Sequence, residues 1–163
     1  GHLECVQLLS SYGASRSFEL MTPPTTAEEQ ATEDIAAWLV SSRDWTTPLH
    51  HLCIITAARA RDLLRGDADI RAMAPAGGPT PLSIAQELHE AGDAPEGSAA
   101  HLVLLAAKPW SPDTHDVFTK VARMRAKAVM LPLYAVAKAM MVNGGMQPID
   151  FCHLVMSFDV VRM

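Results

Sequence analysis

Charged and aromatic side chains are both scarce in this chain, and its cysteines are few. Charged residues make up 19% of the sequence and aromatic residues 6%. The three cysteines, Cys5, Cys53 and Cys152, are far apart and odd in number, whereas a secreted disulfide framework needs several closely spaced pairs. We therefore expect reduced thiols and a cytoplasmic or nuclear location.

The sequence also lacks a long uncharged stretch and an excess of basic residues, and each absence argues against one kind of partner. Uncharged stretches such as Trp45 to Ala58 and Ala128 to Ala137 are shorter than the roughly 18 residues that a membrane-spanning helix needs. Acidic residues outnumber basic ones, and the formal net charge is −5. This balance argues against a general nucleic-acid-binding surface, because such a surface needs a basic face. We expect neither a membrane nor a nucleic-acid partner.

The chain is rich in apolar, helix-forming residues. Hydrophobic residues make up 49% of the 163 residues, which is enough apolar surface for a packed core. Because Ala, Leu and Met are plentiful and aromatic residues are few, the composition favours helix over sheet. The predicted fold class is all-α.

A four-residue motif recurs along the chain. Thr47-Pro48-Leu49-His50 returns as Thr80-Pro81-Leu82-Ser83, and the two threonines are 33 residues apart (80 − 47). Proline suits the first turn of a helix, where its missing N–H would be unpaired anyway, and the threonine before it can cap that helix. His50 lies one turn further on, so we expect it to bond Thr47 and a backbone group of the adjacent loop. The predicted buried stripe consists of Leu49, Leu52 and Cys53.

Self-similarity at this period marks a stacked helical repeat, and the motif resembles that of ankyrin-repeat proteins. The resemblance covers residues 1–107. It implies a short solenoid of helix–turn–helix units with loops projecting at one edge. It also implies that partner proteins bind to those loops and to the concave face of the inner helices, and that the repeat itself carries no catalysis.

The array is irregular at both ends. Residues 1–14 resemble the second helix and exit turn of a unit without its first helix, so we expect the chain to be a fragment of a longer array. Residues 15–46 resemble a shortened, degenerate unit with Thr22-Pro23 as its opening and 34–40 as its outer helix. In the unit at 47–70, Asp67 stands where the family prefers glycine. A turn-rich insertion at 91–97 interrupts the last unit.

Residues 108–163 form a predicted C-terminal helical segment of different character. Ser111 and Pro112 predict a helix start, and Pro132 either kinks this helix or starts a second one. The first helix has an apolar stripe made of Val117, Val121, Met124 and Ala128. A last helix has apolar residues at i, i+3, i+4 and i+7, namely Phe151, Leu154, Val155 and Phe158.

This ending resembles ankyrin proteins that close with an F-box-like element. The match covers residues 146–151 and 154–158, although no leucine directly precedes Pro148 and Ile149 separates Pro148 from Asp150. In that family the element binds the adaptor of a cullin-type ubiquitin ligase, while the repeats hold the substrate. Two interpretations stay open. The four apolar residues of the last helix bind such an adaptor, or they pack on Val117, Val121 and Met124 as a cap.

The sequence offers little support for chemistry. On a helix, His50 and Cys53 share a face and could reach one metal ion, but a closed zinc site needs four ligands and no second pair has suitable spacing. The chain has no nucleophile elbow, Walker loop or dinucleotide fingerprint. We therefore expect no enzyme activity, no cofactor and no metal.

The predicted function is that of a protein-interaction module. Trp45, with Arg43 and Asp44 beside it, is the preferred partner anchor, because Trp and Arg dominate interface energies. The alternative is that Trp45 packs on the neighbouring repeat, since large aromatic residues are mostly buried. The predicted contact residues, chosen for their loop or inner-helix positions, are Arg43, Asp44, Trp45, His51, Arg71 and Met73.

Overall fold

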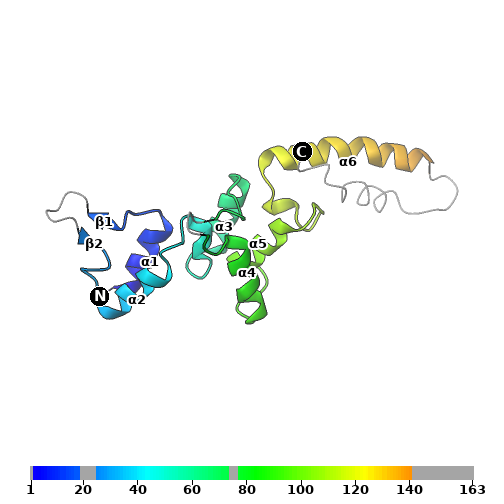
Figure 1. The fold of residues 1–163 in the computed structure, drawn as a ribbon. Coiled ribbons are helices and arrows are strands. Elements are labelled where there is room, and N and C mark those ends of the chain that lie inside the picture. Colours follow the sequence, from blue (N-terminus) through cyan, green and yellow to red (C-terminus); the bar gives the residue numbers. More distant parts are fainter. Residues whose placement is uncertain (1, 19–24, 74–76, 141–163) are drawn as a thin grey trace.

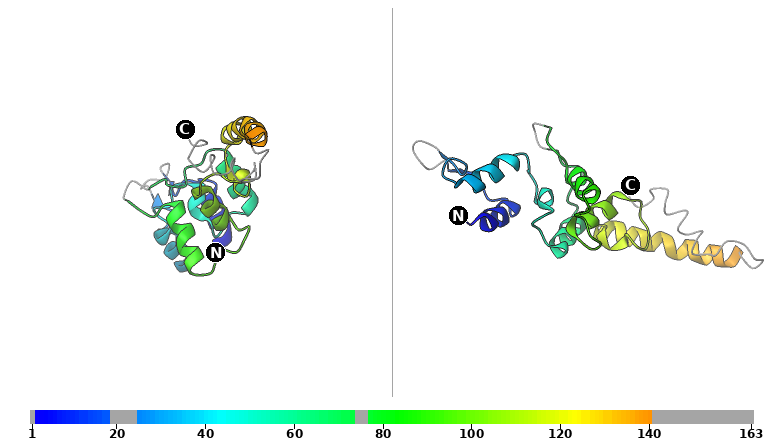
Figure 2. Two further views of the ribbon diagram at one scale, coloured as in Figure 1. Left: turned by 90° about the vertical axis from the view of Figure 1, so that its right-hand side faces the viewer. Right: turned by 90° about the horizontal axis from the view of Figure 1, so that it is seen from below.

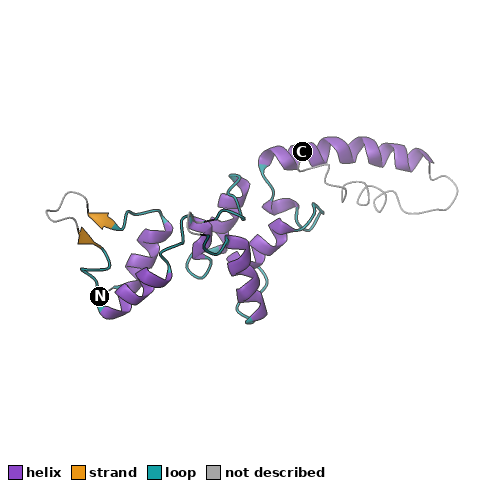
Figure 3. Ribbon diagram, in the orientation of Figure 1, coloured by secondary structure: helices purple, strands orange, loops and turns teal. Residues whose placement is uncertain are grey.

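The computed structural model describes residues 2–18, 25–73 and 77–140. Within these ranges the fold is all-α, as predicted, and a pair of two-residue strands is the one exception (Figure 3). The α-helices are α1 (Leu3–Ser11), α2 (Glu33–Ser41), α3 (Ala57–Arg65), α4 (Pro81–Glu90), α5 (Ala99–Ala107) and α6 (Lys120–Met140). Two short 3₁₀ helices are η1 (Pro48–His51) and η2 (His115–Val117).

The helices follow one another along an elongated body (Figure 1). The first two helices and the strand pair lie at one end, α3 to α5 form the middle, and α6 extends at the other end. Two further views show that α6 projects beyond the packed helices (Figure 2). None of the helices in the described ranges has the length and apolarity that crossing a membrane requires.

The two Thr-Pro openings begin two helical units of the same plan. Thr47 precedes η1 and then α3, while Thr80 precedes α4 and then α5. Both threonines have extended backbone and are followed by a proline in the first turn. The inner helix of the first unit is only the four-residue turn η1. Its outer helix starts at Thr56, whose hydroxyl accepts a hydrogen bond from the Arg59 N–H (3.2 Å).

The second unit contains the predicted turn-rich insertion between its helices. Gly92 and Gly97 adopt φ angles of +83° and +80°, which side chains disfavour. Ser98 then caps α5, because its hydroxyl accepts a hydrogen bond from the His101 N–H (3.2 Å). Both α3 and α4 contact α5, so the outer helix of the second unit joins the two units.

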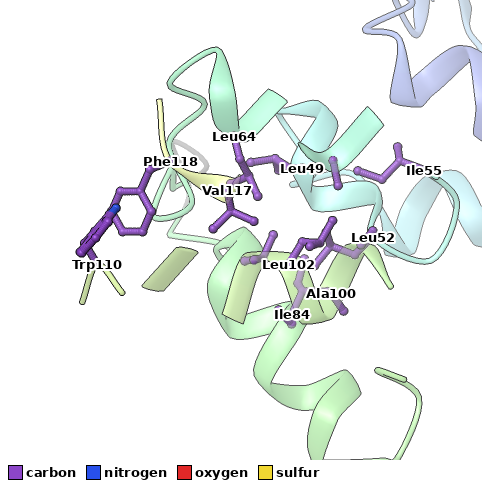
Figure 4. Close-up of a cluster of buried hydrophobic side chains, with 14 of the residues drawn as sticks. Leu49, Leu52, Ile55, Leu64, Ile84, Ala100, Leu102, Trp110, Val117 and Phe118 are labelled. Carbon is purple, nitrogen blue, oxygen red and sulfur yellow. The ribbon is translucent and has the colours of Figure 1, made fainter. Parts of the chain in front are cut away.

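The main core lies where these two units meet the start of the C-terminal segment (Figure 4). Leu49 and Leu52 are buried there, as predicted. Cys53 is exposed, contrary to the prediction. The predicted stripe assumed that an α-helix continues past His51, but the 3₁₀ helix ends at that residue. Ile55 is buried further along the following turn.

The N-terminal helices are tied together by Arg16. Its guanidinium donates to the carbonyl oxygens of Leu39 and Ser42, both at 3.1 Å, and to Ser10 Oγ at 2.6 Å. The same group lies 5.3 Å from the ring centroid of Trp38. These contacts hold α1 against the end of α2.

A short strand pair joins these two helices in sequence. β1 (Ser17–Phe18) pairs antiparallel with β2 (Thr25–Thr26), and the sequence analysis did not predict it. The predicted opening Thr22-Pro23 lies outside the described residues. The helix predicted at 34–40 is present as α2.

Helix α6 starts later than Ser111 and Pro112 predicted. Ser111 and Thr114 instead form a tight turn, in which each hydroxyl accepts a hydrogen bond from the other residue's N–H (3.2 and 2.7 Å). Ser111 thus makes the predicted capping bond, but the 3₁₀ helix η2 follows it in place of an α-helix. α6 begins after Thr119, whose hydroxyl accepts from the Ala122 N–H (3.2 Å), and it continues through Pro132.

The turn after α3 holds a residue in an unfavourable conformation. Asp67 has a φ angle of +69°, a left-handed conformation that costs an L-residue about 1 kcal/mol or more and costs glycine almost nothing. We expect Asp67→Gly to raise the free energy of unfolding by about 0.5 to 1 kcal/mol, measured by urea denaturation.

The matched control for this prediction is Asp69→Gly. The Asp69 carboxylate accepts a hydrogen bond from the Arg71 N–H (2.7 Å), so removing it should lower the free energy of unfolding. Equal effects of the two substitutions would contradict the assignment of strain to Asp67.

Candidate functional site

His50 clamps the base of the loop that leads from the first unit to the second. Its Nδ1 accepts a hydrogen bond from the Thr47 N–H (3.2 Å) and lies 2.8 Å from Thr47 Oγ1. Its Nε2 lies 3.0 Å from the carbonyl oxygen of Pro79. Because Nδ1 accepts, the proton of the neutral ring is on Nε2, which donates to Pro79. The predicted bonds of His50 to Thr47 and to the adjacent loop are therefore confirmed.

The environment of His50 keeps this arrangement in place. The side chain is fully buried, and burial lowers the pKa of His50, although hydrogen bonds to backbone groups of Pro79, Thr47 and Ala72 act in the opposite direction. A second bond, from the Leu82 N–H to the Ile70 carbonyl oxygen (2.9 Å), closes the same loop. The loop therefore leaves the body and rejoins it at fixed points.

Two predicted contact residues lie on this loop. Arg71 is exposed, and the Met73 side chain has 65% of its surface exposed. The Arg71 N–H is held by the Asp69 carboxylate (2.7 Å), which fixes the backbone at Arg71. An exposed methionine and arginine on a fixed backbone make a suitable contact pair for a protein partner.

Arg71 also lines a pocket between the end of α3 and the start of α6. Its volume is about 840 Å³, and Leu64, Val117 and Phe118 contribute apolar wall. The charged residues around it are Arg65, Arg71, Lys120 and Arg125, with Asp67 and Asp69, so that their formal charge is +2 (4 − 2). This excess is opposite in sign to the net charge of the chain.

Two arginines that the sequence analysis did not single out, Arg61 and Arg65, bind Asp116, and Arg65 also lines this pocket. Arg61 Nε lies 3.0 Å from Asp116 Oδ2, and Arg65 forms an ion pair with the other carboxylate oxygen. Arg65 Nε also donates to the Asp116 carbonyl oxygen (2.9 Å). Their i, i+4 spacing on α3 places both on one face, but Asp116 is too distant in sequence to be recognised as their partner.

The other predicted loop residues lie beside α2 and η1. The Arg43 guanidinium forms an exposed ion pair with Glu28 (2.8 Å), which raises the pKa of Arg43. Trp45 is half-buried and makes edge-on ring contacts with Trp38 and His51, with centroids 6.3 and 5.1 Å apart. The structure therefore shows the packing alternative for Trp45, with part of its surface still open. Asp44 is also half-buried.

His51 is not available to a partner, contrary to the prediction. Its side chain is 1% exposed, because the 3₁₀ turn directs it between the rings of Trp38 and Trp45. Burial, together with the charges of Arg16 and His50, lowers the pKa of His51 to about 4. Its Nδ1 is buried without a hydrogen-bond partner. His51 is therefore part of the packing around Trp38 and Trp45.

The described residues do not bring His50 and Cys53 together with further metal ligands. Among the described residues, no group of three or more His, Cys, Asp or Glu side chains is placed to hold a metal ion. His50 is engaged by Thr47 and Pro79, while Cys53 faces outward. The predicted adaptor-binding residues Phe151, Leu154, Val155 and Phe158 lie outside the described residues.

Comparison of the chain with protein-family models, with curated proteins and with solved structures found no match.

Proposed function

We propose that this chain is an ankyrin-type repeat array that binds another protein through the loop carrying Arg71 and Met73. The observation that carries the proposal is the bond between His50 of one Thr-Pro unit and Pro79, the residue just before the next Thr-Pro opening. A side chain of the recurring motif thereby joins consecutive units. Stacked repeats derive their stability from such contacts between neighbours.

The second unit has serine, Ser83, where the first unit has His50, and this difference also supports a repeat array. The Ser83 hydroxyl accepts a hydrogen bond from the Thr80 N–H (2.9 Å), and Thr80 Oγ1 accepts from the Ser83 N–H (3.1 Å). Serine therefore reproduces the local cap that His50 gives to Thr47. It is too short to reach across a further loop as the imidazole does. This fits a unit at the end of an array, where no further loop needs to be held.

The proposed contact surface has a main part and an accessory part. Arg71 and Met73 form the main part, because both are exposed on a loop whose two ends are clamped. Arg43, Asp44 and the open side of Trp45 form the accessory part. Because hydrogen bonds hold the two ends of the loop of Arg71 and Met73 before a partner arrives, binding loses less ordering entropy than at an untethered segment.

The test of this function compares two charge-reversed variants of the whole chain. In the loop variant, Arg71→Glu is combined with Met73→Glu. In the control, Met124→Glu is combined with Lys127→Glu, which alters an exposed methionine and a base on α6 instead. We expect the loop variant to lose captured partners by roughly tenfold or more, as the loss of central contacts does, and the control to retain them. Capture is quantified by mass spectrometry.

Circular dichroism and melting temperature must first show that both variants fold like the parent chain. Unchanged capture by the loop variant would contradict the proposed contact surface. Partners retained by both variants but lost with Phe151→Gln and Leu154→Gln would support the adaptor-binding function in place of the loop-based one.

A further inference from the structure

The pocket between the end of α3 and the start of α6 has an apolar floor. Leu64, Val117 and Phe118 form this floor, and all three are buried members of the core drawn in Figure 4. Val121 and Ile70 continue the apolar surface toward solvent, because Val121 is 58% exposed and Ile70 is half-buried. The sequence analysis placed Val117 and Val121 on one stripe, but only Val117 is in the core. An apolar side chain of a ligand can therefore be buried against Val121 and Ile70.

The pocket lies on the outer side of the repeat units. The outer helices are α3 and α5, and η2, which brings Val117 to the pocket, contacts both of them. The ankyrin resemblance implies binding at the loops and on the inner helices, so this pocket is a different surface. Its volume of about 840 Å³ lies within the roughly 300 to 1,000 Å³ that is usual for small-ligand sites. It has room for a few side chains of a bound segment.

The charge around the pocket is positive. When Arg61 and Asp116, which pair beside Arg65, are included, the formal charge is +2 (5 − 3). The basic residues are Arg61, Arg65, Arg71, Lys120 and Arg125, and the acidic residues are Asp67, Asp69 and Asp116. Because α6 begins at the pocket, the positive end of its dipole adds to this charge. An anionic ligand is therefore favoured.

Arg71 and Lys120 are the bases best placed to meet an anion. Both side chains are exposed, and in the described part of the chain neither forms an ion pair. The Arg71 backbone N–H is held by the Asp69 carboxylate (2.7 Å), so the guanidinium extends from a fixed position. A guanidinium can bind a carboxylate through two parallel hydrogen bonds, whereas a lysine acts as a point charge. The two bases can thus bind two carboxylates of one ligand.

The acidic residues of the pocket argue against a nucleic acid. Asp67 and Asp69 lie on the turn after α3 and line the pocket, where they would repel a continuous row of phosphates. The apolar floor also gives phosphates nothing to bind. A peptide has its charges separated along the chain, so it can place acids opposite the bases and an apolar side chain on the floor.

We propose that this pocket binds an acidic segment of the partner protein, with its carboxylates on Arg71 and Lys120 and an apolar side chain on the apolar wall. This binding mode rests on the proposed function, because Arg71 belongs both to the contact loop and to the pocket. The two surfaces are therefore continuous. The partner is thereby expected to present a short stretch that combines Asp or Glu with Leu, Ile, Val or Phe.

Selection from a phage-displayed library of random short peptides on the whole chain tests the pocket. We expect the enriched peptides to combine a net negative charge with at least one large apolar residue. Fluorescence anisotropy with the synthetic form of the most enriched peptide then gives the Kd. Lys120→Glu should raise this Kd by roughly tenfold or more, because it places like charges opposite each other. Val121→Gln should raise it by roughly threefold, because it removes apolar burial.

Each pocket variant has a matched control on α6. Lys127→Glu makes the same change of charge about two turns further along the same face, and Lys127 does not line the pocket. Leu131→Gln removes an apolar side chain that is 72% exposed and lies outside the pocket. Both controls should leave the Kd unchanged. All four substituted side chains are exposed, and melting temperatures show whether each variant is folded.

Two substitutions separate this proposal from the proposed function. Met73 lies on the contact loop and outside the pocket, whereas Lys120 lines the pocket and lies outside the loop. Partner capture that is lost with Met73→Glu but kept with Lys120→Glu would overturn the pocket and leave the loop-based function intact. Peptide binding that depends on Lys120, together with partner capture that survives Arg71→Glu and Met73→Glu, would support the pocket and overturn the loop.

Three results with the peptides would also overturn the proposal. The first is a selection that enriches no acidic peptide. The second is an equal rise in Kd for Lys120→Glu and Lys127→Glu, which would indicate only the general charge of α6. The third is displacement of the peptide by a DNA duplex at a lower concentration than by unlabelled peptide, which would assign the bases of the pocket to phosphates.

Discussion

Replacing His50 by serine is expected to lower the free energy of unfolding by about 2 kcal/mol, through a lost hydrogen bond and a cavity. Serine stands at the equivalent position of the second unit, where its hydroxyl bonds the Thr80 N–H (2.9 Å). His50→Ser should therefore keep the cap on Thr47. It removes the bonds of the ring to the loop backbone, among them the one from Nε2 to Pro79 (3.0 Å), and the buried volume of the ring.

Urea denaturation measures the loss of stability, and hydrogen exchange locates it. The amides of Thr80 and Leu82 should exchange faster in His50→Ser, because one of the bonds that close the loop is gone. The control Ser83→Ala removes a cap without a link between units, and it should cost about 1 kcal/mol. If Ser83→Ala costs as much as His50→Ser, the link to Pro79 contributes nothing beyond capping.

Acidification from pH 7 to pH 4 is expected to cost about 3 kcal/mol of stability through His51 alone. The pKa of His51 is lowered from 6.5 to about 4 in the folded chain by burial and by the charges of Arg16 and His50. Between these pH values the unfolded chain binds a proton at His51 and the folded chain does not. The free energy of unfolding therefore falls as the pH drops below 6.5 and levels off below about 4.

The control for this prediction is His51→Leu, which has no titrating group at that position. Since Nδ1 of His51 has no hydrogen-bond partner, leucine abolishes no bond to that atom. Urea titrations at pH 7 and pH 4 should show a difference in stability that is about 3 kcal/mol smaller in the variant. The same difference in both proteins would show that other groups, such as the carboxylates, account for the whole acid effect.

Local patterns in the sequence predicted most helices and the hydrogen bonds of His50. The Thr-Pro openings and the insertion at 91–97 depend on neighbours within a few residues, and both are present. The bonds of His50 were predictable because the motif repeats, so the next opening had to lie near the first. The capping bond at Ser111 is present too, but the 3₁₀ helix η2 follows it in place of an α-helix.

Prediction failed where the outcome depends on distant partners. His51 was expected on an accessible inner face, but Trp38 and Trp45 enclose it. The contacts of Arg16 with α2, and of Arg61 and Arg65 with Asp116, join residues more than twenty positions apart. No periodicity in the sequence encodes such pairs. The exposure of Val121 likewise follows from which side of α6 meets the core, and an apolar stripe alone does not specify that side.

The two hydrogen bonds that close the loop between the Thr-Pro units determine how its sequence can change. The two bonds that close it use the ring of His50 and backbone atoms of Pro79, Ile70 and Leu82. Neither bond depends on the identity of the side chains between them. Lengthening a flexible loop is also inexpensive, since doubling its length costs only about 0.6 kcal/mol in closure entropy. Residues 71–78 are therefore a natural grafting site, where foreign binding sequences can be inserted while the helical scaffold beneath stays the same.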